Sequence, residues 1–471
     1  MNSSRPHQSS LFPALRVHVR ALSCAFVCFV VASCASYPER TREAFRAFQS
    51  GQLASAQAAY ADPETTGSEF LTATETGMVA LANGDWDAAL KYLGDAAAIT
   101  KSFEDEALIN PESAGETLLS WTVNERMTRY QGEGYERVMI HACLAMAYLA
   151  KGDLTAARVE VRRANGLLES EEKLYKKSYK AGGLGHVLSA VAYELDRKLA
   201  DAYIDYERMI EKGVGEEIAG KALVRLSHTL NRSDAVDQWE GRFGAEEKVP
   251  ENSASVVVIA GVGVGPYKNE ITLPIPTPDG LLQWSVPQSV RRGQPVAGLS
   301  FHIAGGDRSV RTSVVEDVAA IAQENLSDRI LWLSAKSAVR AILKYQLTKQ
   351  LEKDHGALGT IFGVVFTLVT EHADLRAWQT LPDTWQAARI FLEPGRHEMR
   401  LSADGGESAT LGTFELEPGE TMFVFARSIE TRLFAHAVGG RRVDVTPTRA
   451  TQPTAPTEPA APATPATVGN P

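Results

Sequence analysis

Cysteine is scarce in this chain of 471 residues, and three of its four cysteines, Cys24, Cys28 and Cys34, lie near the beginning, whereas Cys143 is the fourth. If Cys24 and Cys28 are removed with an export signal and Cys34 carries a lipid, only Cys143 remains free and no internal disulfide can form. Cys143 lies in an apolar run, so we expect a small buried side chain there. The chain also lacks an HExxH motif and, after the predicted signal, any closely spaced pair of cysteines, so we predict neither a metal site nor a cofactor.

Basic residues are too few for a general nucleic-acid-binding protein. The chain has 48 Lys and Arg against 58 Asp and Glu, a net charge of -10, whereas binding to phosphates needs a basic surface. Its 44% hydrophobic and 23% charged residues are typical of a globular protein, and its length predicts two or more domains.

The beginning of the chain has the pattern of an export signal. Basic residues precede an apolar run over 21–31, which is shorter than the roughly 20 residues of a membrane-spanning helix. The run ends in Val31-Ala32-Ser33-Cys34, which resembles the lipobox of bacterial lipoproteins. We therefore predict a signal peptide over 1–33 and a lipid on Cys34, with an ordinary secretory signal cut elsewhere as the alternative. Ala35 stands where an inner-membrane retention signal has Asp, which favours the outer membrane and a protein that faces the periplasm.

Glycines recur at a spacing that predicts helical repeats over residues 34–245. Gly51, Gly84 and Gly152 are separated by 33 and 68 residues, close to one and two units of the 34-residue tetratricopeptide repeat. The clearest hairpin spans 129–168, with small residues where its two helices would touch. The later spacing is irregular, so an alanine-rich helical bundle without true repeats is the alternative.

The pattern changes to short strands and longer helices from residue 253 onward. We predict a mixed strand and helix module over 253–385, with strands at 255–260, 270–273 and 299–303 and helices at 313–326 and 329–353. The apolar run 357–369 is too short to span a bilayer, so we expect a buried helix, with an interfacial segment as the alternative.

Alternating short strands end the folded part of the chain. They predict a small antiparallel β module over 386–445, with strands at 388–392, 398–401, 410–416 and 422–426. The tail 446–471 is rich in Pro, Thr and Ala and is expected to be disordered. The predicted fold class is therefore α+β multidomain: a tetratricopeptide-like α-solenoid, a mixed α/β module and a small antiparallel sheet.

Several segments together resemble an uncharacterised family of bacterial tetratricopeptide-repeat lipoproteins. They are YQGE with Tyr135-Glu136, the continuation VMIHACLAMAYLAKGDLTAARVEVRRAN, the segment VGPYKNE over 264–270, and ADLRAWQTLP over 373–382 followed by LEPG. The resemblance covers most of the chain after the signal. It implies an exported, lipid-anchored, helical-repeat protein and brings no established enzymatic role.

Two sets of residues are candidate functional positions. The first lies on the polar edge of the clearest hairpin and would contact a protein or peptide partner: Tyr130, Tyr135, Glu136, Arg158, Arg162 and Arg163. The second would fix the joint between the helical and strand-rich modules, with Asp374 and Arg376 forming charge-assisted hydrogen bonds and Trp378 filling the joint. The glycine-rich stretch 260–266 follows a strand, but Pro266 breaks the dinucleotide fingerprint, so we expect close backbone packing there.

The sequence shows no catalytic constellation, so we predict a binding protein rather than an enzyme. The leading hypothesis is a lipid-anchored periplasmic scaffold or adaptor that binds an envelope protein or peptide through its repeats. An accessory factor for cell-envelope assembly, of peptidoglycan or an exported polymer, is the second hypothesis. An envelope hydrolase with an unrecognised active site is the alternative of a different class.

Overall fold

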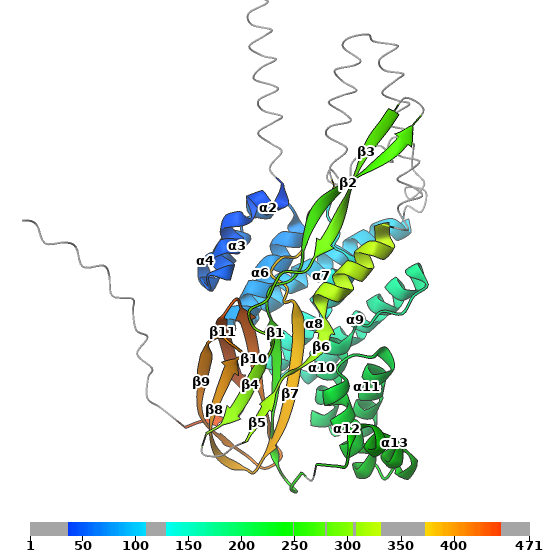
Figure 1. The fold of residues 1–471 in the computed structure, drawn as a ribbon. Coiled ribbons are helices and arrows are strands. Elements are labelled where there is room, and N and C mark those ends of the chain that lie inside the picture. Colours follow the sequence, from blue (N-terminus) through cyan, green and yellow to red (C-terminus); the bar gives the residue numbers. More distant parts are fainter. Residues whose placement is uncertain are drawn as a thin grey trace, which may run out of the picture.

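The structure is a computed structural model that describes residues 36–109, 129–247, 249–277, 280–304, 308–330 and 373–443 (Figure 1). The predicted signal peptide and Cys34, most of the helix predicted over 329–353, the apolar run 357–369 and the tail 446–471 lie outside these residues. No helix within the described ranges is long and apolar enough to cross a membrane.

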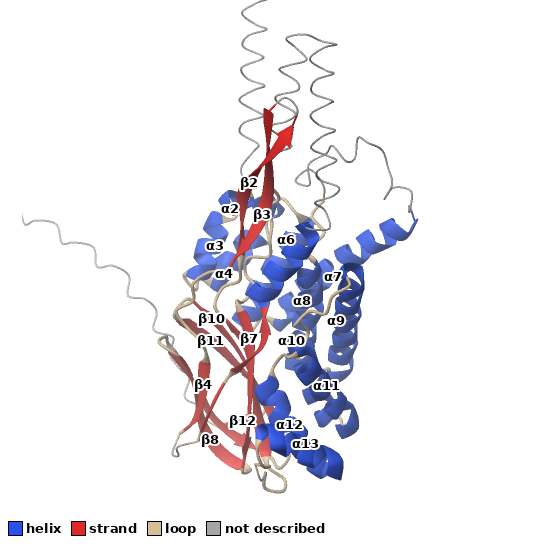
Figure 2. Cartoon of the chain, turned by 45° about the vertical axis from the view of Figure 1, so that its right-hand side comes forward, coloured by secondary structure: helices blue, strands red, loops and turns tan. Residues whose placement is uncertain are grey.

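The first half of the chain consists of helices joined as consecutive hairpins (Figure 2). The predicted turns at Gly51, Gly84 and Gly152 are confirmed, since each glycine lies between two helices with φ between 72° and 77°, where a side chain would be strained. Two short helices, α2 (Tyr37–Arg40) and α5 (Pro63–Thr66), accompany the pairs. The hairpins are α3 (Arg42–Gln49) with α4 (Leu53–Tyr60), α6 (Glu69–Asn83) with α7 (Trp86–Ile109), α8 (Gly134–Ala150) with α9 (Leu154–Tyr175), α10 (Gly183–Leu195) with α11 (Leu199–Lys212), and α12 (Glu216–Thr229) with α13 (Ser233–Phe243).

The second half forms two five-stranded sheets and a separate two-stranded ribbon in the described residues. The first sheet has the order β11-β10-β1-β7-β6: β11 (Arg432–Val438), β10 (Thr421–Ile429), β1 (Ala254–Val262), β7 (Thr384–Leu392) and β6 (Ser313–Asp317). The second has the order β12-β9-β8-β4-β5: β12 (Arg441–Arg442), β9 (Ser408–Leu416), β8 (Gly395–Ala403), β4 (Leu299–Ile303) and β5 (Ser309–Arg311). The ribbon pairs β2 (Tyr267–Thr277) with β3 (Gly280–Val290).

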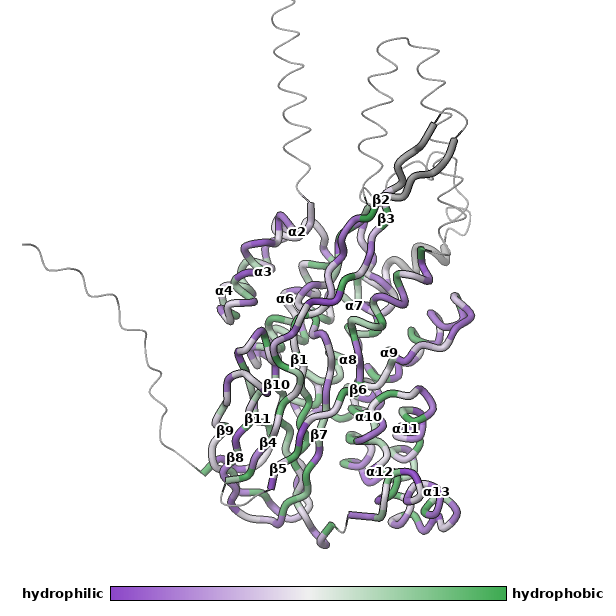
Figure 3. The backbone as a smooth tube through the Cα atoms, viewed as in Figure 1, coloured by the Kyte–Doolittle hydropathy of each residue, from purple (hydrophilic) through white to green (hydrophobic). Residues whose placement is uncertain are grey.

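Strand β1 lies at the centre of the first sheet and is buried on both faces. Val256 and Val258 pack into the core between the two sheets, whereas Val257 and Ile259 pack into the core shared with the helices. This explains why nine consecutive residues of β1 are buried and why the strand has no polar alternation. The molecule is thus layered as helices, sheet and second sheet, with hydrophobic segments gathered along β1 and α10 (Figure 3).

Three predictions about the second half are wrong in detail. The boundary at residue 386 does not separate two sheets, because β1 pairs with both β7 and β10, and β4 pairs with β8. The sheet over 386–445 is also not purely antiparallel, since β10 runs parallel to β1. The helix predicted over 313–326 begins only at residue 318, because 313–317 pair with β7 as an edge strand.

Candidate functional site

Glu136 lies at the junction between helix α8 and the segment that precedes strand β7. Its carboxylate accepts hydrogen bonds from the Trp378 backbone N–H at 2.7 Å and the Tyr130 hydroxyl at 2.7 Å. It also accepts the Glu133 N–H at 2.9 Å and so closes a capping box at the start of α8. Burial raises the pKa of Glu136 above its usual value. The carboxylate therefore joins the helices to the strand-rich half.

The prediction that Tyr130, Tyr135 and Glu136 contact a partner is wrong, because all three side chains are buried. Their exposed fractions are 6%, 8% and 0%. The Tyr135 hydroxyl also points to Glu136, at 3.4 Å. These residues belong to the internal junction rather than to a binding surface.

Glu75 on helix α6 makes the same kind of contact one hairpin earlier. Its carboxylate accepts the backbone N–H groups of Gln379 at 2.7 Å and Thr380 at 2.9 Å, together with the Tyr37 hydroxyl at 2.6 Å. Burial raises the pKa of Glu75 to about 7, although the hydrogen bonds from Thr380, Tyr37 and Gln379 favour the ionised form. Two helices of neighbouring hairpins thus hold three consecutive backbone N–H groups of one segment.

The raised pKa of Glu75 predicts a pH-dependent contribution to stability. In the unfolded chain this carboxyl ionises near pH 4.5, whereas in the folded chain it stays neutral up to about pH 7. The neutral carboxyl therefore contributes its full stabilisation of the fold below pH 4.5, and that contribution is lost as the pH rises toward 7. We expect Glu75→Gln, which cannot ionise, to gain stability relative to the native chain over that interval, by up to about 3 kcal/mol. Urea unfolding at several pH values measures the difference. Glu217→Gln, at an exposed position, is the control, and a difference independent of pH would contradict the assignment.

Glu133 forms a buried ion triad that connects helix α8, the base of β2 and the helical residues 318–330. Its carboxylate pairs with the Lys268 ammonium and, at 2.5 Å, with the Arg329 guanidinium. Burial opposes ionisation, but the two cations outweigh it and lower the pKa of Glu133 to about 2. Lys268 is only 6% exposed, so Glu133 is the anion that balances a buried charge.

The residues predicted to form the joint lie in the segment that Glu75 and Glu136 hold. The Trp378 side chain is 1% exposed and belongs to the core that the helices share with the first sheet. Its indole N–H donates to the Thr380 hydroxyl at 3.2 Å. Asp374 and Arg376 pair with each other through the guanidinium Nε and Nη2 at 2.8–3.1 Å. The Arg376 guanidinium also lies over the Tyr130 ring, 5.0 Å from its centroid.

Arg427 on strand β10 is buried and hydrogen-bonds to the main chain of the glycine-rich stretch 260–266. Its guanidinium is buried and donates to main-chain carbonyl oxygens on three segments: Gly261, Gly263, Thr380, Leu381 and Ser428. Burial lowers the pKa of Arg427 to about 9. Gly265 approaches the Leu381 carbonyl so closely that a Cβ would lie 2.8 Å from its oxygen. Close backbone packing at this stretch is confirmed, and β2 follows it rather than a helix.

The three candidate arginines lie on helix α9, on the outer side of the helical layer. Arg162 and Arg163 are exposed, and Arg163 pairs with Glu160 at 2.6 Å. Arg158 is partly buried, pairs with Asp196 at 2.5 Å and lies over the Tyr193 ring. The inner side has no comparable surface, because the first helices of these hairpins, α8 and α10, are buried almost throughout between the outer helices and the first sheet. The chain's own first sheet therefore covers the inner side of α8 and α10.

A cleft of about 490 Å³ lies between helix α12, the α13 end and the edges of both sheets. This volume is within the range of about 300–1,000 Å³ that ligand pockets have. Edge strand β5 and residues 387–391 of β7 form one wall. The chain as a whole is acidic, but basic side chains predominate among the residues that line this cleft. Glu217 and Glu247 are its acidic lining residues. The basic ones are Lys221, Arg225, Arg308, Arg311 and Arg389. No local sequence pattern indicates this cleft, because its walls come from segments that are far apart in the chain.

One buried carboxylate, that of Glu194, pairs with two arginines on the floor of the cleft. Glu194 on α10 pairs with Arg225 at 2.8 Å and with Arg389 at 2.8 Å. Burial opposes its ionisation, but Arg389 and Arg225 outweigh burial and hold the pKa of Glu194 below its usual value. Both guanidinium groups also lie over the Phe391 ring, at 5.2 Å and 4.7 Å from its centroid. Two cations share one anion here, so the floor is positively charged.

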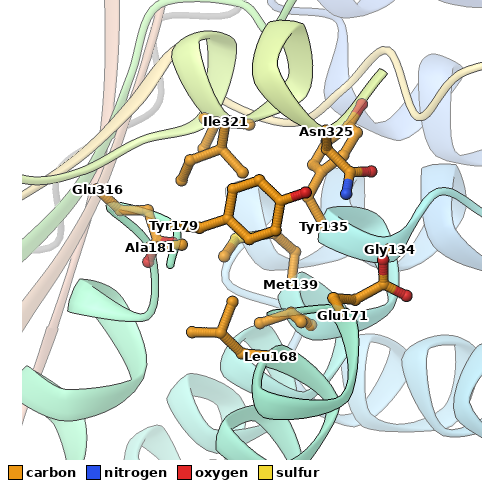
Figure 4. A pocket seen from close by; sticks show the side chains of 12 residues that line it. Gly134, Tyr135, Met139, Leu168, Glu171, Tyr179, Ala181, Glu316, Ile321 and Asn325 are labelled. Carbon is orange, nitrogen blue, oxygen red and sulfur yellow. The ribbon is translucent and has the colours of Figure 1, made fainter. Parts of the chain in front are cut away.

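A second hollow is too small for a ligand. It lies beside α8, α9 and the helical residues 318–330, has a volume of about 20 Å³ and is lined mainly by apolar side chains around Tyr179 (Figure 4). That volume suits about one water molecule. Cys143 is buried, and burial raises the pKa of its thiol. No cluster of possible metal ligands occurs among the described residues.

Comparisons of the chain with protein-family models, with curated proteins and with solved structures find no match.

Proposed function

We propose that this protein is a lipid-anchored adaptor on the periplasmic side of the bacterial outer membrane, held there by Cys34. Its hairpins are tetratricopeptide-like repeats whose inner face is occupied by its own sheet, so the partner binds elsewhere. The basic cleft between α12 and strand β5 is the partner site. The partner contributes an extended peptide segment that carries acidic side chains. A role in cell-envelope assembly is one use of such an adaptor.

The cleft is the observation that supports this proposal. An edge strand such as β5 presents backbone N–H and C=O groups to which an extended segment can pair. The guanidinium groups of Arg308, Arg225 and Arg389 lie within the same cleft and favour carboxylates. An extended acidic segment satisfies both features at once.

Photo-crosslinking in cells tests the partner site. A photo-crosslinking amino acid in place of Lys221, on the cleft wall, is expected to give a discrete adduct with an envelope protein. The same amino acid in place of Arg162, on the outer face of α9, is the matched position and is expected to give none. The Arg308→Glu substitution should abolish the cleft adduct by charge repulsion, whereas Arg163→Glu should leave it unchanged. An adduct from position 162 alone would place the partner on the outer helices and contradict the cleft.

Removal of the lipid-bearing cysteine tests the anchor. We expect the Cys34→Ala chain to be released from the membrane fraction by high salt, because it loses the acyl chains that hold the native protein. Fractionation followed by immunoblotting measures this. The Cys143→Ala chain is the control and should stay in the membrane fraction. Retention of the Cys34→Ala chain in salt-washed membranes would contradict a lipid anchor.

A further inference from the structure

Strand β7 is longer than β6, the strand that pairs with its outer edge. Strand β6 pairs with residues 384–387 and begins at Ser313, because the chain before it forms β5 of the second sheet. Strand β7 continues beyond that point to Leu392 (Figure 1). Within the described residues, 388–392 therefore pair with β1 on one side and with no strand on the other.

The pairing of the first sheet fixes which way the main chain of this edge points. The Ser255 N–H donates to the main chain that leads into β10, and successive residues of a strand bond to opposite sides, so Val256 bonds to β7. Val256 is opposite Ile390, which therefore directs its N–H and C=O groups toward β1. Arg389 and Phe391, on either side of Ile390, direct theirs outward, away from β1.

The outward edge of β7 forms a wall of the basic cleft. Five consecutive residues, 387–391, line the cleft, although neighbouring side chains of a strand point to opposite faces of the sheet. The cleft therefore meets the main-chain edge of β7 rather than one face of the sheet. The Phe391 carbonyl accepts a hydrogen bond from the exposed Arg308 guanidinium at 2.6 Å, in the place of a strand bond. An added strand would replace that side-chain bond with main-chain bonds.

The two faces of this edge differ in chemistry. Arg389 and Phe391 face the helices, where Arg389 lines the floor of the cleft and the Arg225 guanidinium lies over the Phe391 ring. Ala388 and Ile390 belong to the apolar core between the two sheets. On a strand paired with this edge, every second side chain therefore lies beside the guanidinium groups, and the ones between lie beside the apolar core.

We propose that the partner's segment binds as an added strand along residues 388–391 of β7, antiparallel to it as β6 is, and that its acidic residues alternate with small apolar ones. This inference rests on the proposed function of the cleft as the partner site and specifies the chemistry of the partner. The acidic side chains lie on the helix side, beside Arg225 and Arg389. Main-chain bonds to Arg389 and Phe391 set the register of the segment.

A methylated peptide series separates main-chain pairing from charge attraction. The probe is the fluorescein-labelled, amidated peptide Glu-Val-Glu-Val-Glu-Val, the protein is residues 34–471 with Cys34→Ala, and fluorescence anisotropy measures binding. The glutamates lie opposite Arg389 and Phe391 and donate their N–H groups to β7. N-methylation of the glutamates should therefore weaken binding at least about tenfold. N-methylation of the valines, whose nitrogens point away from β7, is the matched control and should change binding less than about twofold.

The other outcomes separate this inference from the proposed function. Equal effects of the two methylations would overturn strand addition and leave the cleft as the partner site, and stronger weakening by the valine series would contradict the antiparallel register. The Arg308→Glu chain should bind the unmethylated peptide at least about tenfold more weakly, and unchanged binding would contradict the cleft itself. A peptide that fails to bind at about 1 mM would overturn the acidic and apolar alternation, whereas crosslinking from position 221 reports the partner site independently.

Hydrogen exchange tests the edge of β7 without a peptide. In the free chain, the outward N–H groups of Arg389 and Phe391 should exchange at least about tenfold faster than that of Ile390 between them, which bonds to β1. Mass spectrometry with fragmentation to single residues measures these rates. Equal protection of all three would mean that another part of the chain or a second copy pairs with this edge, and it would overturn the proposal.

Discussion

The Glu133→Ala substitution is expected to lower the free energy of unfolding by about 3–5 kcal/mol, because it leaves a buried cation without its anion. Lys268 is 6% exposed and pairs with Glu133 at the base of the ribbon. Arg329 is more exposed, at 35% of its side chain, and can recover part of its hydration. Most of the loss should therefore come from Lys268. Urea unfolding followed by circular dichroism measures the change.

A double variant separates the buried charge from packing. Glu133→Ala combined with Lys268→Met removes both charges, and it should recover most of the lost stability, since apolar residues often replace a buried ion pair at little cost. Breaking an exposed pair is the second control: Glu217→Ala, opposite Lys221, should cost less than about 1 kcal/mol. If the double variant is as unstable as Glu133→Ala alone, the loss does not arise from the Lys268 charge.

The sequence predicted the elements of this fold better than their assembly. Three hairpin turns were identified from glycine spacing, because a positive φ is a local requirement that glycine satisfies. The start of β1 follows from a β-branched run bounded by turn residues, and the strand predicted at 299–303 is confirmed as β4. The pairing of β1 with β10 joins residues 166 positions apart, such as Ser255 and Thr421, and no local pattern specifies it.

Glu136 shows why the candidate site was misplaced. A glutamate beside two tyrosines at the start of a helix resembles a polar surface when the chain is read locally. Its principal partner, the Trp378 N–H, lies 242 residues further along the chain. The buried carboxylates of Glu75 and Glu133 were missed for the same reason. One available signal was that Glu75 is the only charged residue of α6 after its first position, since a lone glutamate in such a helix often marks a buried hydrogen-bond acceptor.

The cleft was also beyond prediction from sequence. Arg225 and Arg389 belong to different halves of the chain, and each alone is an ordinary charged residue. They form a charged floor only because Glu194 brings helix α12 and strand β7 together. Edge strand β5, which has three residues, is too short to give a pattern of its own.

The Trp378→Ala substitution should cost about 3–5 kcal/mol, because a large aromatic side chain is removed from a closed core. Trp378 is 1% exposed and packs in the core shared by helices and the first sheet. Its backbone N–H is held by Glu136, so the cavity left by the substitution cannot close by a simple shift of the segment. At an unfolding entropy of about 2.1 cal/mol/K per residue, each kcal/mol lowers the melting temperature of several hundred folded residues by only about 1–1.5 °C, so the melting temperature should fall by roughly 5 °C.

The position of Trp378 also predicts how unfolding changes. Because its core includes helical residues and residues of β1 and β10, weakening it should separate the unfolding of helices from that of the sheets. Calorimetry should show one broadened or divided transition in place of the native one. Leu174→Ala, at a position that is 52% exposed on α9, is the control and should change stability by less than about 0.5 kcal/mol. An unchanged melting temperature in the Trp378→Ala chain would mean that the Glu75 and Glu136 hydrogen bonds, rather than the indole, hold the two halves together.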